Sequence, residues 1–565
     1  MMRKAILLFP LLCLFAIFAV AQNVQSPTFN RDALQTYVQT TMTRKALRGV
    51  APNFSVDKVT PNADGTLNVR ICVAQREYDA FEQLGIPYTI LTPEKAVTAM
   101  ASSYQQFSNG WNKYPTYGAY QETMAVFQSE FPNLCDIDTI LAQTPGGHTL
   151  FVAHISNDLQ NRGDKPAFFY TATMHGDEPV GYYLMLRLIY YLLHNYATDA
   201  QVRQLVDNVD IWICPLENPD GTYRSSNNQL GSWNSTRYNH DGDDLNRSYP
   251  LIGQPVAKSY PPEVQAMMDF GAAHPFVMSA NFHGGAEVVN YPWDTWETLQ
   301  RAIADQAWWD YVGRCYADTC HKTSQNYMTD CNNGVTEGGD WYVITGSRQD
   351  YFNYFLGCRE MTIEVSSDKV VSSNNLPNYW TRNRQSLLNY IAESLHGFRG
   401  IVTDSVTGQP VEARVFVENH DMDNTHTFSR MPLGDYHRPI KGGTWQVTFS
   451  AEGYHTKTLT MNILDGQTLV QDVQLVPDYV GVEENEAVQV RVFPNPASDA
   501  VRIESNGAAI MGVEVFDLSG RRLSQQSLTG TSARVDLKMF AAGIYNLRIV
   551  TENGTVTKRI IRLDD

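Results

Sequence analysis

The sequence predicts an α/β protein with a mixed, largely parallel sheet flanked by helices, followed by two small all-β sandwich domains. Apolar runs such as "AFFYTATM" and "FVMSANFH" alternate with helical patterns between residues 105 and 396, as in a sheet with crossover helices. From residue 397 the pattern changes to short strands separated by Gly and Pro turns. A chain of 565 residues also needs more than one core.

Five segments follow from these changes in pattern. Residues 1–21 combine a basic start, an apolar stretch too short to span a bilayer and a small-residue ending, which together predict a cleaved signal peptide. Residues 22–104 form a small mixed segment that we interpret either as an inhibitory pro-segment or as a permanent docking domain. The α/β region covers 105–396, and the two β domains cover 397–478 and 484–565 around the acidic linker "VGVEENEA".

Charge and cysteine content narrow the class of function. With 43 basic and 60 acidic residues, the net charge of −17 disfavours nucleic acid as a partner and favours cationic ligands. Removing the signal peptide with Cys13 leaves seven cysteines, so at least one is unpaired within the chain. Cys315, Cys320, Cys331 and Cys358 are near enough in sequence for one or two bridges, and without a CxxC pair a cysteine zinc cluster is disfavoured.

Three residues at strand ends could hold a metal. His175 and Glu178 follow one buried strand, and His283 ends another. A His, Glu, His set is typical of catalytic zinc with a fourth position left for water. Each residue alone is more often structural, but open α/β sheets bind ligands beyond the carboxyl ends of their strands. The sequence therefore predicts a metal site there.

Two further polar groups accompany this site. Glu364 lies among apolar residues in "MTIEVS". It is either on an exposed edge strand or a general base whose pKa burial raises. The stretch "DLNRSYP" brings together Asp244, Asn246 and Arg247, and an Asn-Arg pair suits a planar carboxylate.

Taken jointly and in order, these pieces resemble the zinc metallocarboxypeptidases, and more closely the branch of carboxypeptidases D, E, M and N. The resemblance covers residues 105–396. The matching pieces are "HGDEPVG", "NPDG", "DLNRSYP", "NFHGGAEVVNYPWD", "WYVITGSRQDYFNY" and "MTIEVS". "DLNRSYP" has Ser248-Tyr249 where the family more often has Asn-Phe.

The resemblance implies a role for each matching residue. One zinc ion per chain would be bound by His175, Glu178 and His283, with Asp244 orienting a ligating histidine. Glu364 would act as general base and acid. The remaining roles are oxyanion stabilisation by Arg237, closure over substrate by Tyr342, and binding of the terminal carboxylate by Asn246 and Arg247.

The resemblance also implies a preference for C-terminal Lys and Arg. Asp294 lies eleven positions after His283 in "NYPWD", where this branch carries an aspartate in the pocket for the departing side chain. Gln349, just before Asp350, matches the polar residue at the pocket base. A lone aspartate is by default a solvated loop residue, but the match around Asp294 favours the pocket.

The flanking domains agree with this interpretation. Residues 397–478 resemble a transthyretin-like β-sandwich, and the last unit, with "VFPNPASD" and "GIYNLRIVTENGTVTKRIIR", resembles a type IX secretion sorting domain. The latter implies export through the periplasm to the surface or medium, with the secretion machinery as partner and no transmembrane segment in the mature chain.

The expected function is that of a secreted zinc metallocarboxypeptidase acting on peptide and protein C-termini. Two alternatives stay open. One is a peptidoglycan-peptide carboxypeptidase with the same metal site, and the other is a non-catalytic protein that binds peptide C-termini.

Overall fold

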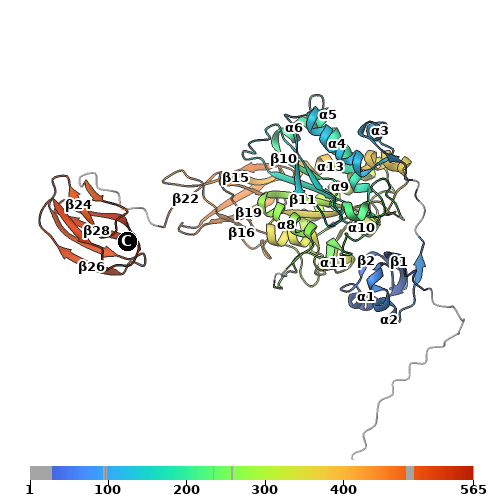
Figure 1. Ribbon diagram of the computed structural model, residues 1–565, viewed down its shortest axis with the longest axis horizontal. Helices are drawn as coiled ribbons and strands as arrows, with labels where there is room; N and C mark the ends of the chain where they lie inside the picture. The colour runs from blue at the N-terminus through green and yellow to red at the C-terminus, as the bar shows by residue number, and fades with distance from the viewer. Residues whose placement is uncertain are drawn as a thin grey trace, which may run out of the picture. The chain divides into compact units, whose positions relative to one another are not determined.

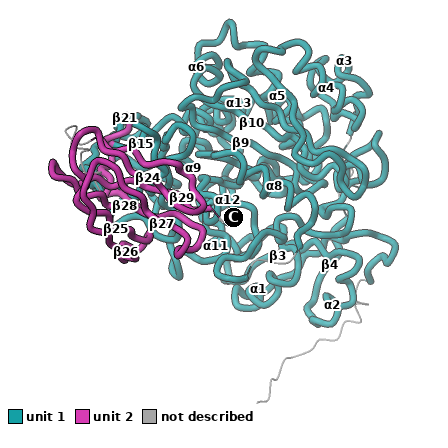
Figure 2. The backbone as a smooth tube through the Cα atoms, turned by 60° about the vertical axis from the view of Figure 1, so that its left-hand side comes forward, with its two compact units in different colours: residues 1–404, 408–451, 456–474 teal, residues 405–407, 452–455, 475–565 magenta. Residues whose placement is uncertain are grey.

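The computed structural model describes residues 28–92, 96, 98–232, 234–255, 259–478 and 489–563 (Figure 1). The predicted signal peptide and the acidic linker lie outside the described residues. Within the described chain, no helix combines the length and apolar character needed to cross a membrane. The chain forms two compact units: residues 1–404, 408–451 and 456–474 form the first, and residues 405–407, 452–455 and 475–565 form the second (Figure 2).

The first unit begins with a small domain of four strands and two helices. Its sheet has the order β2-β3-β1-β4. Alternating apolar residues in "LNVRICVA" place one face of β3 in a separate core, and Thr43 caps the first helix through the Ala46 amide. The elements are β1 (Gln35–Met42), α1 (Arg44–Val50), β2 (Ser55–Pro61), β3 (Leu67–Ala74), η1 (Gln75–Glu77), α2 (Tyr78–Gln83) and β4 (Thr89–Leu91).

The α/β region contains an eight-stranded sheet of order β13-β12-β14-β11-β9-β10-β8-β7. The four strands β14, β11, β9 and β10 are parallel, and antiparallel strands flank them, which confirms the predicted mixed, largely parallel sheet. Strands β9, β11 and β14 are buried at every residue. Helices on both faces explain why their sequences are continuous apolar runs.

The strands of this region are β5 (Met100–Ala101), β6 (Tyr114–Pro115), β7 (Cys135–Leu141), β8 (Leu150–Ile155), β9 (Ala167–Ala172), β10 (Asp210–Cys214), β11 (Phe276–His283), β12 (Glu287–Tyr291), β13 (Val335–Glu337) and β14 (Arg359–Val365). The helices are α3 (Tyr104–Ser108), α4 (Tyr117–Glu130), α5 (Val180–Asn195), α6 (Ala200–Asn208), α7 (Pro219–Thr222), η2 (Leu245–Arg247), α8 (Pro262–Ala273), α9 (Gln306–Thr323), α10 (Asp330–Gly334), α11 (Gly338–Trp341), α12 (Arg348–Leu356), η3 (Ser373–Asn375) and α13 (Leu376–Glu393).

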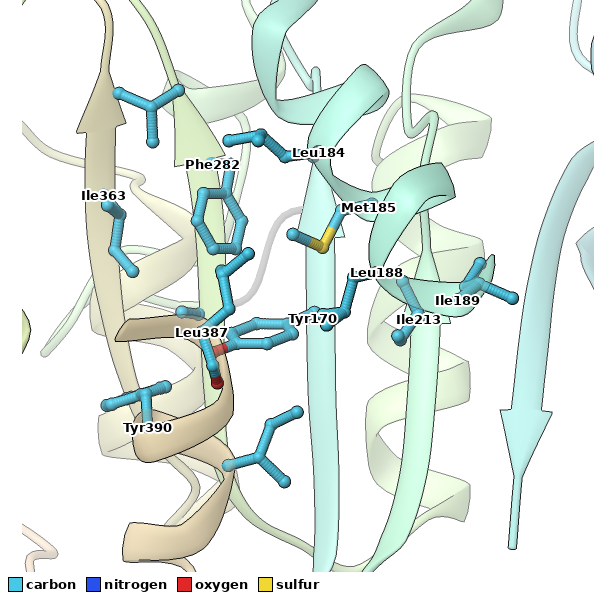
Figure 3. Close-up of a cluster of buried hydrophobic side chains, with 14 of the residues drawn as sticks. Tyr170, Leu184, Met185, Leu188, Ile189, Ile213, Phe282, Ile363, Leu387 and Tyr390 are labelled. Atoms are coloured by element: carbon cyan, nitrogen blue, oxygen red, sulfur yellow. The ribbon is translucent and has the colours of Figure 1, made fainter. Parts of the chain in front are cut away.

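Helix α5 packs tightly on the centre of the sheet. Figure 3 shows Leu184 and Leu188 of this helix beside Phe282 and Tyr170 of the strands. A Cβ at Gly181 would lie 2.7 Å from the Cβ of Phe282, so this position needs glycine. The close approach holds the start of α5 directly after His175 and Glu178.

A β-sandwich follows the α/β region, as predicted. One sheet has the order β17-β16-β19-β20, and a second contains β18-β15-β21. Buried Asp305 of the α/β region pairs with Arg438 and His420 of the sandwich and with Arg359 at the start of β14. The strands are β15 (Gly397–Asp404), β16 (Arg414–Val417), β17 (Thr427–Phe428), β18 (Asp435–Arg438), β19 (Gly443–Ser450), β20 (Lys457–Ile463), β21 (Thr468–Val470) and β22 (Val473–Leu475).

The second compact unit is also all-β. Two sheets, β23-β24-β27 and β26-β25-β28-β29, enclose an apolar core. Its strands are β23 (Val490–Phe493), β24 (Ala500–Ser505), β25 (Ile510–Phe516), β26 (Arg522–Ser527), β27 (Ser532–Asp536), β28 (Gly543–Thr551) and β29 (Gly554–Arg562). The described part of this unit confirms the predicted second β-sandwich.

The expectation of one or two disulfide bridges was wrong. All seven cysteines of the described chain are free thiols. Cys320 of α9 hydrogen-bonds to Ser386, whereas Cys358 lies in a different core region beside Ser279. Nearness in sequence did not bring these thiols together, because helix and strand directions carry them apart.

Candidate active site

The site residues converge because three adjacent parallel strands end at one edge of the sheet. Pairing of β11 with β14 places His283 directly beside Glu364. Strand β9 lies on the other side of β11 and is followed by His175 and Glu178. Ligand sites in open α/β sheets lie at this edge. Glu364 is therefore in a central buried strand, and the edge-strand alternative is wrong.

His175, Glu178 and His283 come together with the chemistry of a metal site. Nδ1 of His175 lies 2.9 Å from Oε1 of Glu178, and Nδ1 of His283 lies 2.9 Å from Oε2 of Glu178. The three side chains offer ligand atoms within 4.8 Å of one another, and all are buried. Burial lowers the pKa of His283 to about 4, which keeps it in the neutral form that binds metals. Two nitrogens and a carboxylate fit zinc.

Asp244 and Arg237 lie next to the candidate metal ligands. Asp244 Oδ1 lies 3.1 Å from Nε2 of His175, on the opposite side of the ring from Glu178. Nε of Arg237 donates to the other oxygen of Asp244 at 2.9 Å. Burial opposes ionisation of Asp244, but Arg237, Arg247 and His175 outweigh it and hold its pKa well below the usual range. An ionised Asp244 can thus orient His175.

The pKa of Glu364 is shifted in the opposite direction to that of Asp244. Burial and the neighbouring charge of Glu178 raise the pKa of Glu364 well above the usual range. Its Oε2 is buried and has no hydrogen-bond partner among the described residues. A buried carboxyl group of raised pKa beside candidate metal ligands is a candidate for proton transfer in catalysis.

Asn246 and Arg247 form the next part of the pocket, on the short helix η2. The amide of Arg348 donates to Oδ1 of Asn246 at 3.0 Å and fixes its orientation. Nε of Arg247 is buried without a hydrogen-bond partner in the described chain. Tyr342 lines the same pocket at the end of α11 and packs edge-on against Trp341. These groups provide donors for a carboxylate.

Asp294 lines the same pocket, and Gln349 contacts its carboxylate. Asp294 is 2% exposed, so the solvated-loop alternative is wrong. Nε2 of Gln349 donates to Asp294 Oδ1 at 3.1 Å, and Nδ2 of Asn290 lies 3.4 Å from the same oxygen. Burial raises the pKa of Asp294. The structure thus brings together every residue predicted for the site.

Two residues that the sequence analysis missed contact the site. Lys369, five positions after Glu364, forms ion pairs with Glu178 and with Asp57 of the small N-terminal domain. Its position in "EVSSDKVV", just beyond a strand end, was a usable signal. Asp57 gave none, because it lies on an ordinary strand of a different domain.

The N-terminal domain lies over the pocket. Asp57 of β2 forms ion pairs with Lys369 and, at 3.6 Å, with Arg237. Beside it, the Val56 carbonyl accepts a hydrogen bond from Nη2 of Arg247 at 3.3 Å, and Ser55 Oγ donates to Asp244 at 2.5 Å. The remaining cavity between Glu364 and Asp294 measures about 20 Å³, which is room for about one water molecule.

Comparison with known proteins gives matches over most of the chain. Residues 120–386 match the zinc carboxypeptidase family, 397–476 the carboxypeptidase regulatory-like domain, and 491–562 the secretion system C-terminal sorting domain. Human carboxypeptidase D is 31% identical over 425 residues, which cover 72% of this chain and 30% of the relative. The chain therefore spans less than a third of that protein.

Other relatives are covered more fully. Carboxypeptidase M of Mus musculus is 32% identical over 368 residues, 62% of this chain and 81% of the relative. Carboxypeptidase A from Helicoverpa armigera matches with a TM-score of 0.49 at 15% identity, over 64% of this chain and 97% of the other. With the family match in the α/β region and a relative of this identity and coverage, the chain belongs to the zinc carboxypeptidase family.

Proposed function

We propose that the protein is a secreted, zinc-dependent metallocarboxypeptidase that hydrolyses the C-terminal peptide bond of peptides and proteins and prefers C-terminal Lys and Arg. One observation carries the proposal: a single pocket contains the metal-binding set, an acid-base carboxyl, donors for a terminal carboxylate and a buried carboxylate at the far end. Each group matches one demand of the reaction.

His175, Glu178 and His283 would hold one zinc ion. When bound, zinc supplies a Lewis acid that polarises the scissile carbonyl and lowers the pKa of water. Glu364 takes a proton from the attacking water and delivers it to the leaving amine, as its raised pKa allows. Arg237 donates to the oxyanion that develops on the scissile carbonyl.

Binding of the terminal carboxylate explains why only the last residue is removed. Asn246 and Arg247 present donors inside a closed pocket, and an arginine binds a planar carboxylate through two parallel hydrogen bonds. An internal segment of a protein has no carboxylate to place there, so it would leave the half-buried guanidinium of Arg247 without an anionic partner. Tyr342, at the same pocket, would close over the bound residue.

The preference for Lys and Arg follows from the charge of Asp294. Burial raises its pKa, and within the described chain Asp294 has no basic partner at ion-pair distance. A basic side chain would supply the missing cation. An apolar side chain would leave the carboxylate buried and unpaired, a penalty of about 1–3 kcal/mol or more.

We further propose that residues 22–104 form the inhibitory pro-segment rather than a docking domain. Asp57 pairs with Arg237, the group assigned to the oxyanion, and the Val56 carbonyl takes a donor of Arg247. A cavity of about 20 Å³ cannot admit a lysine side chain. The catalytic domain then covers 105–396, the transthyretin-like sandwich 397–478 and the sorting domain 484–565. The signal peptide and sorting domain would direct export by the type IX machinery.

The test is a mixture of peptides that differ only in the C-terminal residue, incubated with full-length protein with and without limited trypsin treatment, and analysed by mass spectrometry. We expect release of Arg and Lys, little release of Leu or Phe, and no release with a zinc chelator. Asp294→Ala should lower the ratio of kcat/KM for Arg over Leu by about 10²-fold. Comparable kcat/KM for Arg and Leu in the unaltered enzyme would refute the substrate preference.

A further inference from the structure

Asp350 has a hydrogen-bonding arrangement that differs from that of a usual carboxylate in the first turn of a helix. It lies in the first turn of α12 and is 2% exposed. Such a carboxylate commonly satisfies the free amides of its own helix start. Here Ser347 caps α12 by accepting from the Asp350 amide at 3.2 Å. The Asp350 carboxylate is therefore available for another segment of the chain.

That segment is the turn that carries Asp294. The Asp350 carboxylate accepts hydrogen bonds from the backbone amide of Asp294 at 2.9 Å and from that of Thr295 at 3.0 Å. The Thr295 hydroxyl donates a third at 2.6 Å. Three donors on one buried carboxylate fix the backbone of the turn, and hydrogen bonds to a charged group are roughly twice as strong as neutral ones.

We propose that Asp350 is a positioning residue of the specificity pocket: it anchors the Asp294–Thr295 backbone and thereby aims the Asp294 carboxylate at the side chain of the departing residue. The inference rests on the proposed preference for Lys and Arg. It assigns to Asp350 a function separate from that of Gln349, which contacts the Asp294 carboxylate directly. One helical turn thus holds both the backbone and the side chain of Asp294.

Two neighbouring features restrict the position of the Asp294 side chain. The Ile344 amide donates to the Asp294 carbonyl at 3.0 Å, which holds the other side of its peptide. Gly338 forms the wall facing the carboxylate, and a Cβ there would lie 2.0 Å from Asp294 Oδ1. Because the wall has no side chain, a small shift of the turn would move the carboxylate along it. The anchor at Asp350 prevents this shift.

The charge of Asp350 adds to its positional effect. Burial and the nearby charge of Asp294 raise the pKa of Asp350, and burial raises that of Asp294. The other charged groups that act on this pair are Arg247, which favours the ionised Asp294, and Glu337. A cationic side chain entering the pocket would favour the ionised form of both carboxyl groups.

The experiment compares Asp350→Asn with unaltered full-length protein, both with and without limited trypsin treatment, on peptides ending in Arg and in Leu. Asparagine keeps the shape of the side chain but removes its charge. Its NH2 group cannot accept a hydrogen bond, so it would face at least one of the three donors without bonding to it. We expect kcat/KM for the Arg peptide to fall roughly 30-fold, chiefly through KM, and that for the Leu peptide to change less than about threefold. Bound zinc should be unchanged.

Asp199→Asn is the matched control. Asp199 also accepts two backbone amides, those of Gln201 and Val202 at the start of α6, and it does not line the pocket. This variant should keep the ratio of kcat/KM for the Arg peptide to that for the Leu peptide. Thr295→Val removes only one donor to Asp350 and should lower the ratio in the same direction by about threefold to tenfold.

The outcomes separate the two proposals. If the unaltered enzyme shows no preference for Arg, the proposed substrate class is wrong. If it prefers Arg and Asp350→Asn keeps that preference, or lowers both substrates equally, the positioning role is wrong. Should Asp350→Asn fail to fold, Thr295→Val decides: an unchanged Arg to Leu ratio in that variant overturns the inference.

Discussion

The metal cluster proposed at His175, Glu178 and His283 and the specificity pocket proposed around Asp294 lie in one cavity but differ in how their acidic groups are stabilised. At the metal cluster, burial opposes ionisation of Glu178, yet His175, Lys369 and His283 hold its pKa well below the usual range. At the specificity pocket, Asp294 and Asp350 are as deeply buried but have raised pKa values. No described residue forms an ion pair with either of them.

The difference shows which charges the protein supplies and which it leaves to the ligand. A buried carboxylate without a cation is costly, because desolvation favours its neutral form. The metal cluster meets this cost with its own basic residues and would gain zinc. In the specificity pocket, the desolvation of the carboxyl groups is not offset until a basic side chain enters. This arrangement favours selectivity for a basic residue over stability of the empty pocket.

The largest expected effect acts on the metal cluster alone. Removing zinc with a chelator should lower release of C-terminal Arg by more than about 10³-fold, since Lewis-acid activation supplies several kcal/mol. Adding Zn²⁺ back should restore activity, and metal analysis should find one zinc per chain. Full activity in protein shown to be free of metal would contradict the assignment of the cluster.

Glu364→Gln should come next, with a loss of about 10²- to 10⁴-fold in kcat. The amide keeps the shape of the side chain but cannot accept and release the proton. Because Glu364 is not a metal ligand in this scheme, bound zinc should equal that of the unaltered enzyme. The ratio of Arg to Leu should also persist, since the specificity pocket is untouched, so a near-normal kcat would show that the base is misassigned.

Asp57→Ala tests whether inhibition by the N-terminal domain depends on its ion pairs beside the proposed metal ligands. Asp57 pairs with Arg237 and Lys369, and in the described chain no hydrogen bond or ion pair joins it to Asp294. Its loss should raise the activity of untreated full-length protein by about tenfold, the equivalent of about 1.4 kcal/mol of lost contact energy between the N-terminal domain and the pocket. Asp79→Ala breaks an exposed pair with Arg31 of the same domain and should leave the latency unchanged. Equal activity of the two variants would refute the contribution of Asp57.

The smallest effect concerns pH and the specificity pocket. Burial and the charge of Asp294 raise the pKa of Asp350 to about 7. Below this pH the pair carries a proton, and above it both carboxylates are ionised. The ratio of kcat/KM for Arg over Leu should thus increase a few-fold, roughly threefold to tenfold, as pH rises through 7. Taking the ratio cancels effects common to both peptides, and a flat ratio would show that these carboxylates do not titrate there.

Much of the fold and the site could be read from local pattern. Uninterrupted apolar runs predicted buried parallel strands, because such strands are covered on both faces. Parallel strands end at the same edge, so His175, His283 and Glu364 could be expected to meet. The quoted motifs then led to Asp294, which lines the same pocket, and to Gln349, which contacts it.

The remaining features depend on contacts between segments distant in sequence. Cysteine pairing was predicted from spacing and failed, because spacing does not set the distance between thiols on different elements. Asp57 and Asp350 act on the cavity from another domain and from a helix turn, through hydrogen bonds and ion pairs that no periodicity reports. Hydrophobic periodicity records which residues are buried, a local property, whereas the partner of a buried polar group depends on how the elements pack.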